Sequence, residues 1–289
     1  MVVFKLLNRE LPFMKLVKAT LTLALMGIFS SAYADEIPSH SQLVTANEVN
    51  WGYLNPLRGD QSPGATDLWG DRTKDMETGM LVKFQKGFTS PPHIHNITYR
   101  AIVIEGLMHN DDPKAEEMWM PAGSFWTQPA GETHVTAAEG QDNMIYLEID
   151  RGPYLVQPAD EHFDNGEKPL NLAESNIVWL DKSDVKSIHG KNVEISSLWG
   201  SNKVGKLGGS MVKLPAGYQG KIDVNAKEFR AVVIKGDVSY QSAETKQKKE
   251  LAPGSYFGST GKFEHGISVS STGATIYIRT NGKYDITSN

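Results

Sequence analysis

The sequence contains an internal repeat. Residues 67–108 and residues 197–238 align over their whole length at an offset of 130, and the alignment needs no gap. The aligned pairs include tryptophans, arginines and glycines: Trp69 with Trp199, Arg100 with Arg230, Gly87 with Gly217 and Gly106 with Gly236. Self-similarity at a fixed offset indicates that one structural unit occurs twice. We therefore expect two related units in this chain.

Each copy, with the residues that follow it, is rich in short strand-forming segments. The first has LVKF, TYRAIVIE and MIYLEI, and the second has MVKL, FRAVVIK and ATIYIRT, all separated by turns with Gly, Pro, Asn or Asp. No amphipathic helical pattern of useful length follows residue 34. Short strands between regular turns are typical of an all-β sandwich or closed barrel. The 289 residues, 39% of them hydrophobic, suffice for two cores.

Two glycine-framed segments of the first copy carry histidines. His93 and His95 lie two residues apart, so in a strand both side chains point to the same face and can bind one ion. The first segment reads Gly87, five residues, His93-Ile94-His95, three residues, Tyr99, six residues, Gly106; the second reads Gly123, five residues, Pro129-Ala130-Gly131, two residues, His134. The spacing predicts a metal site of His93, His95 and His134.

These segments resemble the two signature motifs of the cupin superfamily, and every fixed glycine, proline and histidine of the motifs is present at its spacing. The resemblance implies a bicupin, which consists of two tandem jelly-roll-like β-barrels. It places a metal-binding barrel at residues 42–156, a polar linker at 157–175 and a second barrel at 176–289. Two positions depart from the motifs: Tyr99 replaces the usual glutamate ligand, and Ala138 replaces an asparagine.

The second copy does not repeat the histidines. At the offset of 130, Asp223 and Asn225 replace His93 and His95, and Phe229 replaces Tyr99; only His265, at an offset of 131, corresponds to His134. One carboxylate, one neutral amide and one imidazole make a poor metal site. We expect the second barrel to be structural, either packing on the first or forming a homodimer.

Tyr99 and His109 are the candidates for catalytic roles. Tyr99 shares strand parity with His95, so its hydroxyl can bond a metal-bound water or substrate, contact the metal, or only pack in the core as Phe229 would. His109 follows Gly106 by three residues and can serve as a fourth ligand, act as an acid-base group, or lie at the rim.

Other residues near the motifs have simpler expected roles. By parity Arg100 points away from the metal, and its twin Arg230 lies where no metal is expected, so both are structural candidates. Glu132 shapes the turn before His134. Trp119, Phe125 and Trp126 either wall a substrate pocket or fill the barrel core.

The absence of cysteine restricts any metal to nitrogen and oxygen ligands. Three neutral imidazoles leave a divalent ion with its full charge, which favours an anionic ligand. On iron(II), three histidines leave open positions for a chelating substrate and dioxygen. Several three-histidine cupins are iron dioxygenases, so the resemblance favours Fe(II), with Zn, Mn or Ni as alternatives. On zinc, the same ligands favour hydrolytic or lyase chemistry through an activated water.

The sequence therefore predicts a metal-dependent, oxygenase-type enzyme that acts on a small anionic or chelating substrate. Two alternatives stay open. One is a non-catalytic, sensor-like cupin that binds a metal or a small ligand, and the other is a Zn- or Mn-dependent lyase or isomerase. Oxygen consumption by the Fe(II)-loaded protein distinguishes the first prediction from both alternatives.

The N-terminal segment indicates export. Residues 1–34 contain a basic stretch after Met14, an apolar run and an A-x-A site, the order of a cleaved signal peptide. The apolar run is too short to span a bilayer. We expect a periplasmic or secreted protein with no membrane attachment after cleavage. The formal charge of -5 makes nucleic acid an unsuitable partner, which leaves small molecules as the expected ligands.

Overall fold

The computed structural model describes residues 39–201, 203–244, 246 and 248–289. The predicted signal peptide, residues 1–34, lies outside these residues. Apart from three short 3-10 helices, η1 (Pro56–Gln61), η2 (Ala159–Glu161) and η3 (Glu174–Asn176), the regular structure of the described residues is β-strand. The all-β prediction is confirmed. No helix among the described residues is long and apolar enough to cross a membrane.

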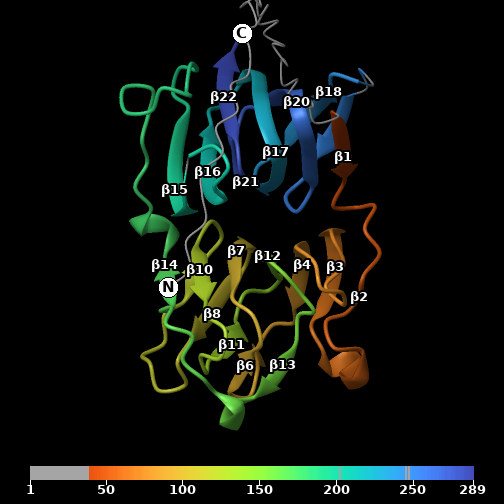
Figure 1. The fold of residues 1–289 in the computed structure, drawn as a ribbon, viewed down its shortest axis with the longest axis vertical. Coiled ribbons are helices and arrows are strands. Elements are labelled where there is room, and N and C mark those ends of the chain that lie inside the picture. The colour runs from red at the N-terminus through yellow and green to blue at the C-terminus, as the bar shows by residue number, and fades with distance from the viewer. Residues whose placement is uncertain (1–38, 202, 245, 247) are drawn as a thin grey trace, which may run out of the picture. The chain divides into compact units, whose positions relative to one another are not determined.

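The strands β2 to β14 make up what we call the N-terminal half, in which every pairing is antiparallel (Figure 1). A seven-stranded sheet has the order β14-β10-β7-β12-β4-β3-β2, a four-stranded sheet the order β5-β11-β8-β9, and β13 pairs with β6. The strands are β2 (Gly52–Tyr53), β3 (Gly64–Trp69), β4 (Thr78–Phe84), β5 (Phe88–Thr89), β6 (His93–His95), β7 (Tyr99–Glu105), β8 (Leu107–Asp111), β9 (Met120–Pro121), β10 (Phe125–Gln128), β11 (Val135–Ala138), β12 (Asn143–Ile149), β13 (Val156–Pro158) and β14 (Leu170–Leu172).

The remaining strands form the C-terminal half, which is a single nine-stranded sheet. Seven of its strands follow the order β15-β16-β21-β17-β20-β18-β19, and the other two are β1, which pairs with β20, and β22, which pairs with β17. Its longest strands are β17 and β20, and their pairing shifts register between Ala226 and Phe229, an irregularity of the kind that lets long strands bend. The strands are β1 (His40–Val44), β15 (Glu194–Gly200), β16 (Gly208–Leu214), β17 (Gln219–Lys235), β18 (Val238–Ser242), β19 (Lys248–Leu251), β20 (Tyr256–Val269), β21 (Ala274–Thr280) and β22 (Lys283–Ser288).

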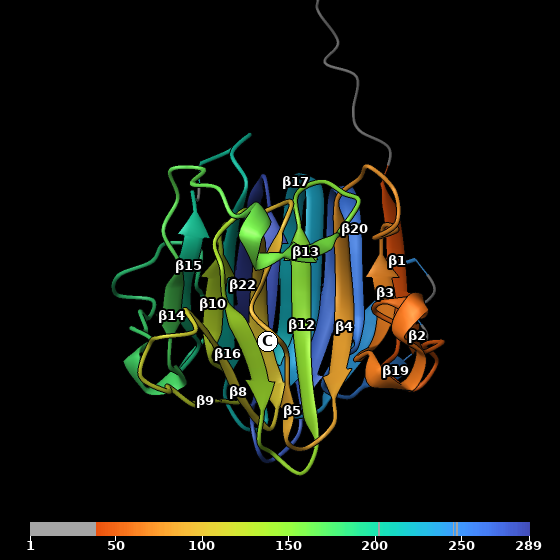
Figure 2. The same ribbon diagram turned by 90° about the horizontal axis from the view of Figure 1, so that it is seen from below.

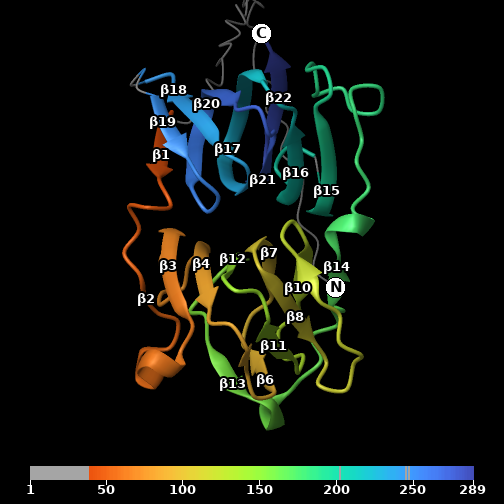
Figure 3. The ribbon, with the colours of Figure 1, turned by 180° about the vertical axis from the view of Figure 1, so that it is seen from behind.

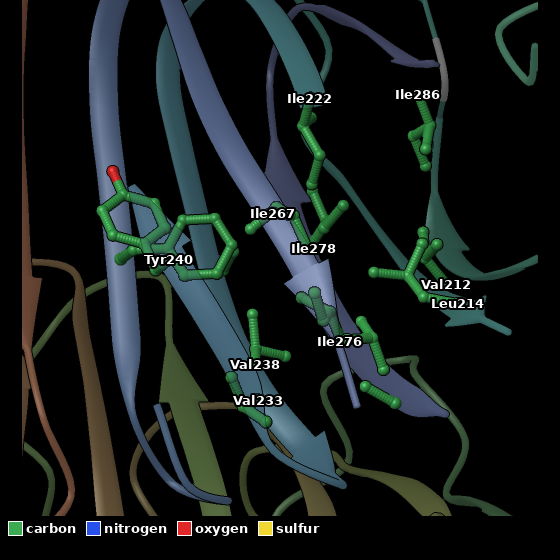
Figure 4. Packing of buried hydrophobic residues seen from close by; sticks show 14 of the residues in the cluster. Val212, Leu214, Ile222, Val233, Val238, Tyr240, Ile267, Ile276, Ile278 and Ile286 are labelled. Atoms are coloured by element: carbon green, nitrogen blue, oxygen red, sulfur yellow. The ribbon is translucent and has the colours of Figure 1, made fainter. Parts of the chain in front are cut away.

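Three apolar clusters lie in succession through the described residues. One is inside the C-terminal half, where residues such as Val233, Ile276 and Ile278 pack together (Figure 4). A second is inside the N-terminal half, and its members come from both the seven-stranded and the four-stranded sheets. The third joins residues of both halves, including Tyr146 and Tyr277. Seen from below, the seven-stranded sheet lies across the nine-stranded sheet (Figure 2). The third cluster combines side chains of these two sheets.

The contact between the halves has a two-fold pattern that follows the sequence repeat. Arg100 stacks on Trp199 with its guanidinium 3.6 Å from the ring centre, and Arg230 stacks on Trp69 at 4.3 Å. Each arginine thus covers the tryptophan of the other half. Cation–π contacts of this kind favour association. The aligned residues of the repeat therefore hold the two halves together.

A buried ionic cluster lies in the same contact region. Arg279 of β21 is fully buried and pairs with Asp150 at 2.6 Å, with Glu228 at 2.9 Å and with Glu148 at 3.7 Å. Burial raises the pKa of Glu148, while Arg279 acts to lower it. Burial would also raise the pKa of Asp150, but Arg100 and Arg279 together lower it. The cation is therefore compensated by carboxylates of both halves.

Two segments pair differently from the predicted domain limits. The predicted first barrel began at residue 42, yet β1 pairs with β20 of the C-terminal half. The predicted linker, residues 157–175, contains η2 and β14, and β14 pairs with β10 of the N-terminal half. These pairings connect residues far apart in the chain, which local composition does not report. The chain therefore crosses between the halves near its start as well as after η3.

We expect Arg279→Met to lower the free energy of unfolding by about 3–5 kcal/mol, because it leaves buried carboxylates without their cation. Urea denaturation at pH 7 measures this change. Arg151→Met, at an exposed arginine, is the matched control and should change stability by less than about 0.5 kcal/mol. Equal stabilities of the two variants would contradict the structural role of the cluster.

Candidate metal centre

The three predicted histidines meet at the end of the N-terminal half away from the C-terminal half, where β6, β11 and β13 lie (Figure 3). His93 and His95 occupy the two ends of β6, and His134 directly precedes β11. The backbones of His93 and His134 exchange two hydrogen bonds, of 3.1 and 3.0 Å. This bridge brings the two sequence motifs together.

The side chains form one compact group. A ligand nitrogen from each of His93, His95 and His134 lies within 4.8 Å of the others, and all three residues are buried. The ring centres of His93 and His134 are 4.2 Å apart, and that of His95 is 5.0 Å and 5.2 Å from them. Among the described residues this is the group of His, Cys, Asp or Glu side chains with metal-holding geometry.

Backbone carbonyls determine which ring nitrogen faces the site. Nδ1 of His93 lies 2.9 Å from the Pro91 carbonyl oxygen, Nδ1 of His95 lies 3.1 Å from that of Leu155, and Nδ1 of His134 lies 3.2 Å from that of Glu132. A carbonyl oxygen only accepts a hydrogen bond, so each Nδ1 carries the proton and each Nε2 keeps its lone pair. This is the arrangement of metal-binding histidines in proteins.

The electrostatics keep these imidazoles neutral. Burial, with the neighbouring His134 and His93, lowers the pKa of His95 well below its ordinary value. Burial and His93 lower the pKa of His134 to about 3, and burial lowers that of His93. Neutral imidazole is the form that binds a metal. The donor set therefore fits a divalent transition metal without a protonation cost near pH 7.

Tyr99, the first residue of β7, lies beside this group. Its hydroxyl donates a 2.9 Å hydrogen bond to Asn110 Oδ1 and lies 3.4 Å from His134 Nε2. Burial raises the pKa of Tyr99, so the phenol stays protonated. Tyr99 therefore occupies the position next to the ligands that strand parity predicts.

A buried polar network surrounds Tyr99. Thr136 Oγ1 also donates to Asn110 Oδ1, at 2.8 Å, and Asn110 Nδ2 donates to Gln128 Oε1 at 2.9 Å. Gln128 Nε2 in turn donates to the Glu132 carbonyl oxygen, which is the acceptor for His134 Nδ1. Glu132 thus acts at this turn through its backbone carbonyl oxygen, which contacts Gln128 and His134. Such a satisfied network holds Tyr99 and His134 in place.

Tyr154 is a site residue that the sequence analysis did not single out. Its ring stacks on His95 with centres 4.6 Å apart, and its hydroxyl lies 3.3 Å from His95 Nε2. Asn96, next to His95, ties this segment down by accepting from the Leu155 N–H and donating to the Pro153 carbonyl. Tyr154 follows a turn after β12, so no strand periodicity could have indicated it.

A cavity of about 90 Å³ opens onto His93 and His95. Its walls are largely apolar and include Phe84, Phe88 and Trp126. Of the three aromatic residues predicted near the second motif, Trp126 faces this cavity, while Phe125 belongs to the cluster between the halves. Trp119 instead lies against His109, with ring centres 5.8 Å apart.

The structure does not support a ligand role for His109. Its Nδ1 lies 3.3 Å from the Met118 carbonyl oxygen, and it is not among the three grouped histidines. Successive strand residues point to opposite faces, and on β8 it is Asn110 that points to Tyr99.

In the C-terminal half, the residues that align with the three histidines are His265, Asp223 and Asn225, and they do not form such a group. Both ring nitrogens of His265 are occupied, Nδ1 by Tyr240 at 2.8 Å and Nε2 by Ser259 at 2.9 Å. Asp223 pairs with Lys221 at 3.2 Å, and Asn225 is exposed. Arg100 points away from the three histidines, as its parity predicts, and pairs with Asp150 at 3.0 Å.

The family model for a domain of unknown function, DUF4437, matches residues 42–287. The chain belongs to the DUF4437 family. No curated protein matches the chain. The family match therefore covers both halves but carries no activity with it.

Solved structures resemble the chain over most of its length. A "putative dioxygenase" of Nostoc punctiforme covers 86% of each chain at 13% identity with a TM-score of 0.63. The protein Ylba of E. coli, of family DUF861, covers 83% of this chain and 90% of its own at 14% identity and a TM-score of 0.55. The salicylate 1,2-dioxygenase of Pseudoaminobacter salicylatoxidans, in complex with gentisate, covers 77% and 78% at 11% identity and a TM-score of 0.51.

These neighbours are cupin-type proteins, so the chain has a cupin-type fold, as the two histidine motifs predict. At such low identity the likeness concerns the fold alone. Activity depends on the site that each protein builds on that fold.

We expect His134→Ala to weaken metal binding by more than about 100-fold, because loss of an outer-shell partner alone costs 10- to 100-fold. Titration with Co(II) or Zn(II) measures the affinity. Far-UV circular dichroism should stay unchanged, since both apolar cores remain. The control is His189→Ala, at an exposed histidine of the C-terminal half. Retention of full affinity by His134→Ala would contradict the assigned site.

Proposed function

We propose that this protein is an exported, metal-dependent bicupin that carries out an oxygenase-type reaction on a small anionic or chelating substrate. His93, His95 and His134 hold the metal, for which Fe(II) is favoured. Residues 1–34 act as a signal peptide, and the mature protein resides in the periplasm or outside the cell. The N-terminal half is the metal-binding barrel, and the C-terminal half is the second, structural barrel.

The observation that carries the proposal is the convergence of one ring nitrogen from each of His93, His95 and His134. Each Nδ1 donates a hydrogen bond to a backbone carbonyl oxygen, which leaves Nε2 as the nitrogen that can bind a metal. Three neutral ligand nitrogens therefore lie within 4.8 Å of one another. The chain supplies no thiolate, and no carboxylate belongs to this group of described residues. Neutral imidazole donors leave an ion with its positive charge, which suits an anionic substrate that binds beside them.

The composition of the cavity favours oxygenase chemistry over a lyase or isomerase. No Asp or Glu side chain is among the described residues that line it. The phenols at the site are poor bases, because burial raises the pKa of Tyr99 and of Tyr154. Proton abstraction therefore lacks a suitable group among the residues that line the cavity, whereas dioxygen activation would be supplied by an iron ion held by His93, His95 and His134.

The protein's own residues then have three tasks. The backbone carbonyl oxygens orient the three imidazole rings that would hold the metal, and the apolar walls exclude water from the cavity. Tyr99 keeps its proton, and its hydroxyl can donate to a substrate oxygen beside His134 by turning away from Asn110 Oδ1, its present acceptor. Tyr154 lies flat on His95 and limits the movement of that ligand.

A non-catalytic, ligand-binding cupin is the second candidate. The same observation favours it, namely that no described carboxylate lining the cavity could act as a general base. Such a protein would bind metal and a small ligand without turnover. Oxygen consumption separates the two candidates.

Protein purified from the periplasm without a histidine tag should contain about one iron per chain by elemental analysis, and His95→Ala should contain none. The iron-loaded protein should consume oxygen with some members of a panel of thiols, diketones and aromatic carboxylates. Metal without turnover on the whole panel would favour the binder. Activity that persists under strict anaerobiosis would instead identify a lyase or isomerase.

Tyr99→Phe should leave the metal affinity within about threefold of wild type and lower turnover by about tenfold or more, since one hydrogen bond to a reacting group is removed. Metal titration and oxygen uptake measure the two quantities. Thr66→Val, at a buried hydroxyl of β3 outside the cavity lining, is the control. If Tyr99→Phe changes neither quantity, the role of Tyr99 is packing.

A further inference from the structure

The polar groups that line the cavity are mostly engaged with one another. Ser90 Oγ accepts from the Thr136 N–H at 3.0 Å, and Thr136 Oγ1 donates to Asn110 at 2.8 Å. Ser62 Oγ accepts from the Asn55 N–H at 2.8 Å and donates to the Pro63 carbonyl. These groups are satisfied by the protein and do not require a ligand.

Two donors in the lining are left without a partner among the described residues. The indole Nε1 of Trp126 is fully buried and has no hydrogen-bond partner of normal length and angle, its interaction with Tyr99 being a weak one. A buried donor without a partner is destabilising, so a ligand that accepts a hydrogen bond from it is stabilising. It is one sign that the cavity is built to hold an acceptor.

The second donor in the cavity lining is the guanidinium group of Arg58, in η1. It is exposed, lines the cavity, and forms no ion pair with the described carboxylates. Among the described arginines, Arg151 also has no ion pair but does not line the cavity, whereas four others pair with carboxylates: Arg72 with Asp67, Arg100 with Asp150, Arg230 with Glu228 and Arg279 with several.

Arg58 and Trp126 differ in how deeply they are buried in the cavity wall. Arg58 is exposed and marks the open end of the cavity, whereas Trp126 is completely buried. Between them the walls are apolar, with Val82, Phe84 and Leu147 among them. A cavity with donors at its ends, apolar sides and no described acidic lining residue suits an anion that has an apolar body.

We propose that the cavity binds a compact organic carboxylate and that Arg58 is the residue that recognises its carboxylate group. A planar guanidinium at an accessible edge can bind a carboxylate through two parallel hydrogen bonds. The proposal rests on the proposed function, because it names the substrate class of the same site. Arg58 is then a specificity residue, because it lines the cavity without belonging to the three grouped histidines.

The volume limits the size of the ligand. A cavity of about 90 Å³ admits a compact ligand rather than an extended one. Benzoate, which has nine non-hydrogen atoms, is a suitable probe. Benzamide has the same shape without the charge and reports on the contribution of the carboxylate.

The test is calorimetric titration of benzoate and benzamide into the Zn(II)-loaded protein, in which no redox reaction occurs. We expect benzoate to bind at least tenfold more tightly than benzamide. Arg58→Gln should weaken benzoate binding by about 10- to 100-fold, should leave benzamide binding unchanged, and should keep the zinc content of wild type. Arg151→Gln, at an exposed arginine outside the cavity lining, is the matched control and should change neither affinity.

Three results would overturn the proposal: no binding of benzoate, equal binding of both probes, or an Arg58→Gln variant that binds benzoate as wild type does. Failure of the proposed function looks different. If the protein takes up no zinc yet still prefers benzoate in an Arg58-dependent way, the metal assignment fails while the carboxylate site stands. If zinc binds and the preference is absent, only the carboxylate site fails.

Discussion

The strands β12 and β21 are buried on both faces, and this constraint shapes the rest of the fold. Ile145 and Leu147 of β12 face the core of the N-terminal half, while Tyr146 between them faces the C-terminal half. Because two sheets must cover these strands, neither half can be separated without exposing apolar surface. The arginines and carboxylates between the halves are therefore buried with it, and they have to be paired.

Burying one side of the N-terminal half against its neighbour leaves the opposite end for chemistry. There the His93–His134 backbone bridge joins the two motifs, and carbonyl oxygens orient all three imidazoles. The ligands are thus held by backbone, which side-chain motion does not disturb. The satisfied network around Asn110 adds a second layer of support. The contact between the halves and the metal centre thus lie at opposite ends of the N-terminal half. The two copies of the repeat can therefore share the contact and still differ in their sites.

In the C-terminal half, the position that corresponds to the metal centre lacks the group of three histidines. His265 is bonded on both nitrogens by Tyr240 and Ser259, and Phe229 stacks on its ring with centres 5.0 Å apart. Burial lowers the pKa of His265 to about 3, so the imidazole is neutral and acts as part of the core. A Tyr-to-Phe difference between Tyr99 and Phe229 therefore accompanies a change from polar site to apolar packing.

The sequence by itself determined the all-β class and the convergence of His93, His95 and His134, because strand parity and turn spacing are local properties. It also placed Tyr99 beside the ligands and Arg100 away from them. Tertiary structure alone decided that Asn110 rather than His109 faces the site, that Tyr154 covers His95, and that Arg58 borders the cavity. These positions depend on strand registers and on segments that approach after folding, and sequence spacing carries no information on such long-range contacts.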